Sequence, residues 1–283
     1  MDEGFLLEDS TIAILGLGLM GGSLALALGG HCRAVWGSDP DPATLEAACR
    51  RRIVDRAVAD PAEVAAAANV IVLAAPVPAI LELLERLPSL TDNPCIVIDI
   101  GSTKQAIVGS MGRLPARFDP IGGHPLCGKE DLSLANAERE LYRNATFFLT
   151  PLDRTTARAV SAASQIVDAI GAKPVMVDAA KHDHMLAATS HLPFLVSSAL
   201  ALAAPDDCAG FAGPGFRSAS RLAGTSSSMM LGVLQSNREN VLQALHLLRA
   251  ELTGIERALA EQDFPFLEKI LDEARNKYRK LVQ

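Results

Sequence analysis

The sequence has no surplus of positive charge. Its 26 lysines and arginines are outnumbered by 33 aspartates and glutamates, and the formal net charge is −7 at pH 7. Proteins that bind nucleic acid usually carry a basic patch on the binding domain. We therefore expect a partner other than nucleic acid.

Paired cysteines, an export signal and membrane segments are also missing. The five cysteines form no Cys-x-x-Cys pair, which fits a reducing compartment better than a disulfide framework. The first ten residues, MDEGFLLEDS, are acidic and lack the apolar stretch of a signal peptide. No apolar run reaches membrane-spanning length without a charge or a proline. We expect a cytoplasmic protein without a membrane segment, and the 49% hydrophobic content predicts a sizeable core.

What the sequence does contain is a glycine-rich turn between a predicted strand and a predicted helix. Residues 11–28 read TIAILGLGLMGGSLALAL and include the pattern Gly-x-Gly-x-x-Gly. In dinucleotide-binding folds the first glycine permits a tight turn, the second lets the backbone approach a pyrophosphate, and the third allows close packing of helix on strand. The flanking strand and helix are the context that the motif requires. We expect five residues of this turn to bind a dinucleotide: Gly16, Gly18, Leu19, Met20 and Gly21.

An acidic residue follows at the end of the second predicted strand. Asp39 stands where dinucleotide-binding folds carry an acid that bonds the ribose hydroxyls of NAD and repels the extra phosphate of NADP. The alternative is that Asp39 only opens a turn before Pro40. The motif favours NAD as the cofactor, with NADP as the second choice.

Strands and helices alternate up to about residue 178, which predicts a doubly wound, mostly parallel sheet of the Rossmann type. Ligands of such sheets bind outside the carboxyl ends of the strands. Ala75 and Pro76 follow one buried strand and Ser102 follows the next, so we expect all three beside the cofactor. Ser102 could equally serve as the N-cap of the next helix. Residues 179–283 are predicted to be helical, which gives two domains, 1–178 and 179–283.

Several histidines and arginines are candidates for chemistry. His124 lies in the segment IGGHPLCGKE, which we expect to be a rigid loop, and its neutral imidazole could accept a proton. His184 is expected to be an interior histidine, whereas His191 directly precedes Leu192-Pro193, where a helix distortion could aim it at a cleft. The histidine spacing argues against a metal site. Arg217 and Arg221 are four residues apart and could clamp a carboxylate.

Five segments, GLGLMGGS, DIGSTK, GGHPLCG, HDHMLAATSHLP and GFRSASRLA, occur in this order. Together they resemble the prephenate/arogenate dehydrogenase family of tyrosine biosynthesis, over about residues 11–282. The resemblance implies a Rossmann-like domain followed by a helical dimerisation domain, and hence a homodimer. It also implies NAD-dependent oxidative decarboxylation, of prephenate to 4-hydroxyphenylpyruvate or of arogenate to tyrosine.

The resemblance assigns roles by position in these motifs. His124 is similar to the catalytic histidine that bonds the substrate 4-hydroxyl, and Ser102 to the serine that bonds the same hydroxyl and orients the histidine. His191 matches a histidine of the substrate pocket, and Arg221 an arginine that binds substrate carboxylate. Further substrate-binding candidates are Arg217, Glu130 and Lys129.

Some features leave the function open. Phe194 replaces a second histidine of many prephenate-type members, which favours arogenate, whereas Asp39 favours NAD and many arogenate-specific members use NADP. Lys129 and Glu130 replace a more usual small or polar pair. One alternative is a 3-hydroxyacid- or imine-type oxidoreductase of the same architecture. Another is a non-catalytic sensor that binds a dinucleotide.

Overall fold

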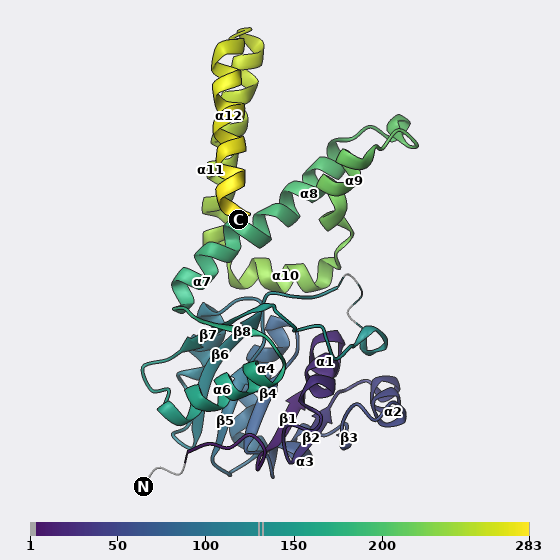
Figure 1. Cartoon of the computed structure of the whole chain (residues 1–283), viewed down its shortest axis with the longest axis vertical. Coiled ribbons are helices and arrows are strands. Elements are labelled where there is room, and N and C mark those ends of the chain that lie inside the picture. Colours follow the sequence, from purple (N-terminus) through teal and green to yellow (C-terminus); the bar gives the residue numbers. More distant parts are fainter. Residues whose placement is uncertain (1–3, 130, 132, 283) are drawn as a thin grey trace.

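The chain folds into a sheet domain with a helical domain above it (Figure 1). The computed structural model describes residues 4–129, 131 and 133–282. Glu130, one of the substrate-binding candidates, lies outside the described residues.

One eight-stranded sheet forms the centre of the first domain. Its strand order is β3-β2-β1-β4-β5-β6-β7-β8. Neighbouring strands run parallel except at β6 and β7, which are antiparallel. This topology confirms the predicted Rossmann-like, mostly parallel sheet. The strands are β1 (Thr11–Leu15), β2 (Ala34–Ser38), β3 (Arg56–Val58), β4 (Val70–Leu73), β5 (Cys95–Asp99), β6 (Phe118–Pro125), β7 (Thr146–Pro151) and β8 (Lys173–Met176).

Helices cover both faces of the sheet, and each face has its own apolar core. Alternate residues of β1 point to opposite sides, so that Ile12 and Ile14 pack in one core while Ala13 and Leu15 pack in the other. Because both faces are covered, β1, β4 and β5 are completely buried. The helices of this domain are α1 (Leu19–Leu28), α2 (Pro42–Arg50), α3 (Pro61–Ala65), α4 (Val77–Leu90), α5 (Gln105–Met111) and α6 (Ala157–Ala169), with a short 3₁₀ turn at Leu134–Asn136.

The segment around His124 corrects the prediction of a rigid loop. His124 lies in β6, where it pairs with Phe148 of the antiparallel strand β7. Packing, and not a turn, accounts for the two glycines before it. A Cβ atom on Gly123 would stand 2.5 Å from the Asp99 carbonyl oxygen, and one on Gly122 would stand 3.0 Å from the Val108 side chain. A strand of small residues can therefore lie close to β5 and α5 and still present His124 at its carboxyl end.

The helical domain begins with one continuous helix. It consists of α7 (Ala179–Leu186), a π-helical turn (Ala187–His191) and α8 (Leu192–Ala203). Pro193 has no N–H to donate, and the wider turn directly before it accommodates this loss. By length and composition alone the helix could cross a membrane, a test that core helices of soluble proteins also pass. The remaining helices are α9 (Pro214–Ser220), α10 (Ser227–Ser236), α11 (Arg238–Ala260) and α12 (Phe264–Leu281), with 3₁₀ turns at Asp206–Cys208 and Arg221–Gly224.

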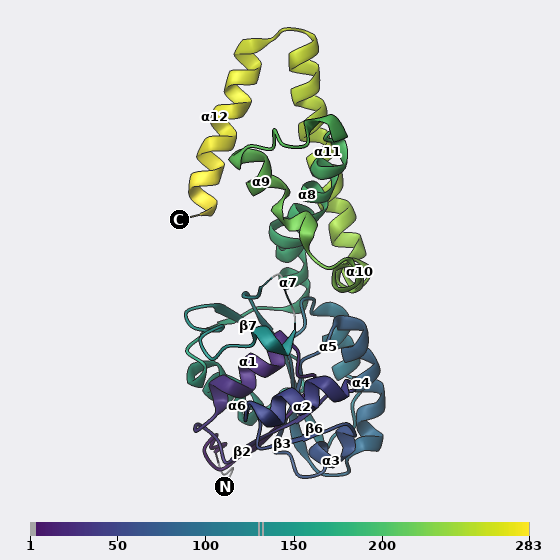
Figure 2. The ribbon, with the colours of Figure 1, turned by 90° about the vertical axis from the view of Figure 1, so that its right-hand side faces the viewer.

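Helices α11 and α12 extend away from the sheet as an antiparallel pair (Figure 2). None of the residues of α12 is buried, and α11 buries only Val241, Ala244 and Ala258. Large apolar side chains on both helices are instead exposed, among them Leu247, Leu252, Phe264, Leu271, Tyr278 and Leu281. The helical domain thus leaves much of its apolar surface uncovered in a single chain.

Candidate active site

A cavity of about 620 Å³ lies at the carboxyl edge of the sheet. Glycines, alanines and serines of the sheet domain make up part of its wall, together with Met229 and Val233 of α10. Eight of the nine residues predicted to bind the cofactor line it: Gly16, Gly18, Leu19, Met20, Asp39, Ala75, Pro76 and Ser102.

The glycines of the turn are required by close approach of neighbouring backbone. Gly16 has φ +104°, and a Cβ atom there would stand 2.4 Å from the Ala74 carbonyl oxygen. Gly21 does not line the cavity, but a Cβ atom on it would stand 1.9 Å from the carbonyl oxygen of Gly16. No other residue type therefore fits at either position while α1 packs this closely on β1.

The first turn of α1 suits an anion. Its N-cap residue, Gly18, has no side chain to accept a hydrogen bond from the first N–H groups of the helix. These donors and the positive end of the helix dipole point at the cavity edge, where the pyrophosphate of a dinucleotide would accept from them. The residues present therefore fit a dinucleotide.

Asp39 combines the two roles considered for it. One carboxylate oxygen accepts a hydrogen bond from the Leu17 N–H at 2.8 Å, and the other accepts from the Asp41 N–H at 3.0 Å. Asp39 thus braces the glycine turn and also lines the cavity. A carboxylate in this place can accept from ribose hydroxyls and disfavours a phosphate there.

Ser102 is not the N-cap of the following helix, which corrects the alternative considered for it. The first N–H groups of α5, from Lys104 and Gln105, are instead bonded by the Asp183 carboxylate of α7, at 2.7 and 2.9 Å. Ser102 is half-buried and lines the cavity. Its hydroxyl makes no hydrogen bond to another residue of the described chain, so it remains available to a ligand.

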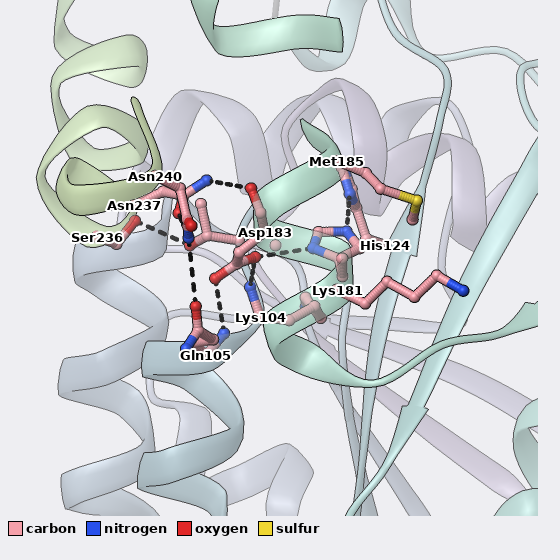
Figure 3. Close-up of polar contacts among 12 residues, drawn as sticks. Lys104, Gln105, His124, Lys181, Asp183, Met185, Ser236, Asn237 and Asn240 are labelled. Carbon is pink, nitrogen blue, oxygen red and sulfur yellow. Dashed lines mark hydrogen bonds and ion pairs between the residues drawn. The ribbon is translucent and has the colours of Figure 1, made fainter. Parts of the chain in front are cut away.

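His124 belongs to a buried chain of polar contacts between the two domains (Figure 3). Its Nδ1 atom lies 2.8 Å from Nε2 of His182, and Nδ1 of His182 lies 2.8 Å from a carboxylate oxygen of Asp183. Only 8% of His124 is exposed, and His182 and Asp183 are completely buried. The Phe148 ring packs edge-on against His182, with the ring centroids 5.3 Å apart.

A buried ion pair supports the strand that carries His124. The Lys104 ammonium, with no exposed surface, donates to the Asp99 carboxylate and, at 2.5 Å, to the Gly123 carbonyl. Asp99 also accepts from the N–H groups of Gly101 at 2.8 Å and Gly123 at 3.1 Å. The pair therefore joins the end of β5 to the residue directly before His124.

Burial and charge keep His124 neutral. Burial lowers its pKa well below the usual 6.5, and the Lys104 ammonium and the neighbouring histidines act in the same direction. Burial likewise lowers the pKa of Lys104, although Asp99 opposes this shift. A neutral imidazole is the form that can accept a proton.

His191 lies at the end of the π-helical turn and is 2% exposed. Its Nδ1 atom is 3.2 Å from the Asn237 amide nitrogen, which also donates to the Asp183 carbonyl at 2.7 Å. Burial lowers the pKa of His191 to about 4, although Asp183 opposes the shift. The structure thus brings His191 close to the chain of His124, His182 and Asp183.

The arginine and lysine candidates lie elsewhere. Arg221 and Lys129 border a second, more open hollow of about 430 Å³ together with Gly128, Leu222 and Thr225. Lys129 also forms an ion pair with Glu138 at 2.7 Å. Arg217 is exposed on α9 and lines neither hollow. The structure therefore brings Lys129 and Arg221 together but does not bring them into the cavity that Ser102 lines.

Sequence reasoning missed two residues of the site. His184, the expected interior histidine, is exposed, whereas His182 is the buried one. Asp183 is not among the residues that the motifs indicate. The dipeptide His-Asp at the start of a long helix was the available signal, but only the fold shows that its partners are on β6 and α5.

Comparison with known families agrees with this architecture. Residues 24–176 match the family model described as "Prephenate dehydrogenase, nucleotide-binding domain", and residues 178–273 match "Prephenate dehydrogenase, dimerization domain". The chain belongs to the prephenate dehydrogenase family. The sequence is 31% identical to the prephenate dehydrogenase of Bacillus subtilis over 264 residues, which cover 89% of this chain and 71% of that protein.

Solved structures of prephenate and arogenate dehydrogenases share the fold. The arogenate dehydrogenase of Synechocystis is 31% identical, with a TM-score of 0.81 and coverage of 96% of this chain and 99% of that one. The prephenate dehydrogenase of A. aeolicus, solved with hydroxyphenyl propionate and NAD⁺, has a TM-score of 0.87 at 24% identity. The alignment with that structure covers 96% of this chain and 98% of the other, so the shared fold extends through both domains.

Proposed function

We propose that the protein oxidises and decarboxylates prephenate, arogenate or both, with NAD as the cofactor. The observation that carries the proposal is the neutral, buried His124 at the carboxyl end of β6, close to the sheet edge at which Ser102 lines the dinucleotide cavity. Family membership supports the same reaction.

The reaction needs few groups from the protein. His124 accepts the proton of the ring hydroxyl while the carbon that bears this hydroxyl is oxidised. Ser102 donates a hydrogen bond at the same end of the site. The ring carboxylate leaves as carbon dioxide and the ring becomes aromatic, which supplies the driving force, so the protein mainly positions the substrate and takes the proton.

NAD, held by the turn from Gly16 to Gly21 and by Asp39, would supply the hydride acceptor. The Asp39 carboxylate supports NAD over NADP, because a second negative group beside it would be repelled.

Arg221 and Lys129 provide positive charge for a substrate carboxylate. Their hollow is open, both residues line it, and Lys129 follows His124 by five residues in the sequence. We assign Arg221 the main part in binding and Lys129, with the outlying Arg217, a lesser one.

The test is a turnover assay with NAD and each substrate in turn, following the absorbance of the reduced cofactor. We expect reduction with at least one substrate, accompanied by release of carbon dioxide. A folded sample that reduces NAD with neither would contradict the proposal. Activity on a simple 3-hydroxy acid would support the 3-hydroxyacid-type alternative, and NAD binding without any turnover would support the sensor alternative.

The choice between prephenate and arogenate depends on the residues near the part of the substrate that carries a keto group in prephenate and an amino group in arogenate. Phe194 supports arogenate, because a histidine at this position could pair with a group that arogenate lacks. A comparison of kcat/KM for the two substrates, in the wild type and in Phe194→His, measures the preference. We expect the variant to shift it toward prephenate.

We further propose a homodimer formed through the helical domain. The exposed apolar side chains of α11 and α12 support it, and so does the description of the matching family model as a dimerization domain. Leu271→Glu should produce monomers in sedimentation velocity, whereas Lys277→Glu on the same helix should not. A wild-type protein that sediments as a monomer would contradict the proposal. The scattered free cysteines support a cytoplasmic location.

A further inference from the structure

We propose that His182 and Asp183 are positioning residues that hold His124 as the tautomer with its proton on Nδ1. The Nε2 atom of His124 then presents a lone pair to the substrate hydroxyl. The identity of that hydroxyl rests on the proposed function, but the hydrogen-bond chain is a property of the protein alone.

Asp183 determines which atom is the donor in each hydrogen bond from His124 through His182 to Asp183. Its carboxylate accepts from the N–H groups of Lys104 and Gln105, at 2.7 and 2.9 Å. These donors form the N-terminal turn of α5, where the helix dipole favours a negative charge. An ionised carboxylate can only accept hydrogen bonds. The His182 Nδ1 atom, 2.8 Å from Asp183, is therefore the donor of that contact.

Because His182 donates from Nδ1, its Nε2 atom must accept, and this determines the role of His124. A neutral imidazole that carries its proton on Nδ1 has a lone pair on Nε2. The Nε2 atom of His182 lies 2.8 Å from Nδ1 of His124, so this second contact requires an N–H on His124. A neutral His124 with its proton on Nδ1 has no proton on Nε2. The reverse direction requires a doubly protonated His182 and leaves His124 without a free lone pair on Nε2.

The groups around His124 and His182 favour the neutral form of both imidazoles. The charged and titratable groups packed around it are Lys104 and Asp99, which pair with one another, Asp183, which is bonded by two N–H groups, and His191. A second proton on His182 would place a cation without exposed surface among these groups. When His124 takes a proton, its Nδ1–H continues to donate to His182, and the chain ends on the Asp183 carboxylate.

The same carboxylate has a second effect. Because Asp183 bonds the first turn of α5, it also fixes the end of the segment that carries Ser102. One residue of the helical domain thus holds both the proton acceptor and the segment beside the cofactor cavity in the sheet domain.

A direct test is the tautomer of His124 in the wild-type protein. Long-range ¹H–¹⁵N correlations of ¹⁵N-histidine-labelled protein distinguish a protonated Nδ1 from a protonated Nε2, and His124→Asn assigns the signal. We expect His124 to be protonated on Nδ1 at a pH where its ring is neutral. A proton on Nε2 would overturn the proposal. The measurement needs no substrate, so it is independent of whether the proposed reaction occurs.

Two variants of His182 test the consequence for turnover. His182→Phe retains the ring packing against Phe148 but removes the acceptor, whereas His182→Gln retains an acceptor for the His124 Nδ1–H. We expect kcat of His182→Phe to fall on the order of 10²-fold, since losing the correct tautomer in a catalytic triad costs up to about 10⁴-fold.

The pattern of effects separates positioning from a merely structural role. In His182→Phe the KM values should change little, and the acid limb of the pH profile should move to lower pH because the charged His124 loses its acceptor. His182→Gln should recover turnover to within about 10-fold of the wild type. Unchanged turnover in His182→Phe, or an equal loss in both variants, would overturn the proposal. An inactive wild type would contradict the proposed reaction and leave the tautomer result standing.

Discussion

The two ends of the site are built in different ways. At the cofactor end, the sheet domain supplies most of a cavity that several glycines and alanines line, and the helical domain adds only Met229 and Val233. At the reaction end, both domains supply buried polar side chains that bond one another, His124 from β6 and His182 and Asp183 from α7. The cofactor end requires residues small enough to let backbone segments pack closely. The reaction end requires specific side chains, from separate elements, that form hydrogen bonds with one another.

This difference predicts different responses to substitution. A change at the reaction end should affect turnover, acid stability or folding, because buried polar groups lose partners when one member is removed. A change at the edge of the cofactor cavity should mainly affect which ligand binds.

The largest effect is expected for His124→Asn. Asparagine retains an N–H that can donate toward His182, but it has no basic nitrogen, so kcat should fall by about 10²- to 10⁴-fold. NAD binding, measured by calorimetry, should be almost unchanged, because His124 does not line the cofactor cavity. An equal loss of NAD affinity would contradict the view that the two ends respond separately to substitution. Unchanged turnover would exclude His124 as the proton acceptor.

The buried ion pair predicts the next largest effect, on stability. Lys104→Met leaves the Asp99 carboxylate in the interior without its cation, and this type of change costs about 3–5 kcal/mol of unfolding free energy. Denaturant unfolding measures the loss. The double variant Asp99→Asn/Lys104→Met removes the uncompensated charge and should recover much of it. A loss below about 1 kcal/mol in Lys104→Met would mean that the two N–H groups on Asp99 suffice to hold its charge.

The same contrast explains how much could be predicted from the sequence. The cofactor end was predictable because its requirements are local. The glycines stand at fixed spacing between a strand and a helix, and the clash distances at Gly16 and Gly21 show that backbone contact alone dictates them. The alternating strands and helices predicted the parallel sheet for the same reason.

The reaction end was only partly predictable. The sequence marks His124 as a candidate, yet its neighbouring glycines suggest a loop, because a sequence does not show that Gly123 lies against the Asp99 carbonyl of a neighbouring strand. His182 could not be distinguished from His184, since their difference is a matter of which helix face meets β6. Similarly, the acceptor for the N–H groups at the start of α5 is Asp183, 79 residues away from Lys104 in the chain.

Acid should lower the free energy of unfolding through the buried groups of the reaction end. The contribution of His191 can be measured separately. Its pKa of about 4 in the folded protein lies below the usual 6.5 of an unfolded chain. The unfolded chain therefore binds the proton first, so the contribution of His191 is complete above pH 6.5 and is lost as the pH falls toward 4. The loss should amount to about 3 kcal/mol at most.

The matched comparison is His191→Gln, which removes this titration but retains a polar side chain. The difference in unfolding free energy between wild type and variant should change by up to about 3 kcal/mol between pH 6.5 and 4, with the wild type losing more. Parallel stability curves across this range would show that His191 is protonated equally in the folded and unfolded states.

Arg221→Ala should mainly weaken substrate binding. A hydrogen bond to a charged group contributes about 1.5–3 kcal/mol, so the substrate KM should rise by about 10- to 10²-fold with little change in kcat. Arg217→Ala is the matched control, four residues earlier and exposed on α9, and it should have a smaller effect. A fall in kcat without a change in KM would contradict a binding role for Arg221 and would extend the reaction end to the second hollow.

The smallest effect is expected at the rim of the cofactor end, for Asp39→Asn. Asparagine can still accept the hydrogen bond from Leu17, so the glycine turn should stay in place while the negative charge is removed. Repulsion between two charges about 4 Å apart in water is about 1 kcal/mol, so the ratio of kcat/KM for NAD to that for NADP should fall by about 5- to 10-fold. Asp41→Asn is the control, because Asp41 caps α2 and does not line the cavity. If the ratio is unchanged in Asp39→Asn, the carboxylate serves only to brace the turn, and cofactor choice at this end is set by cavity shape and not by charge.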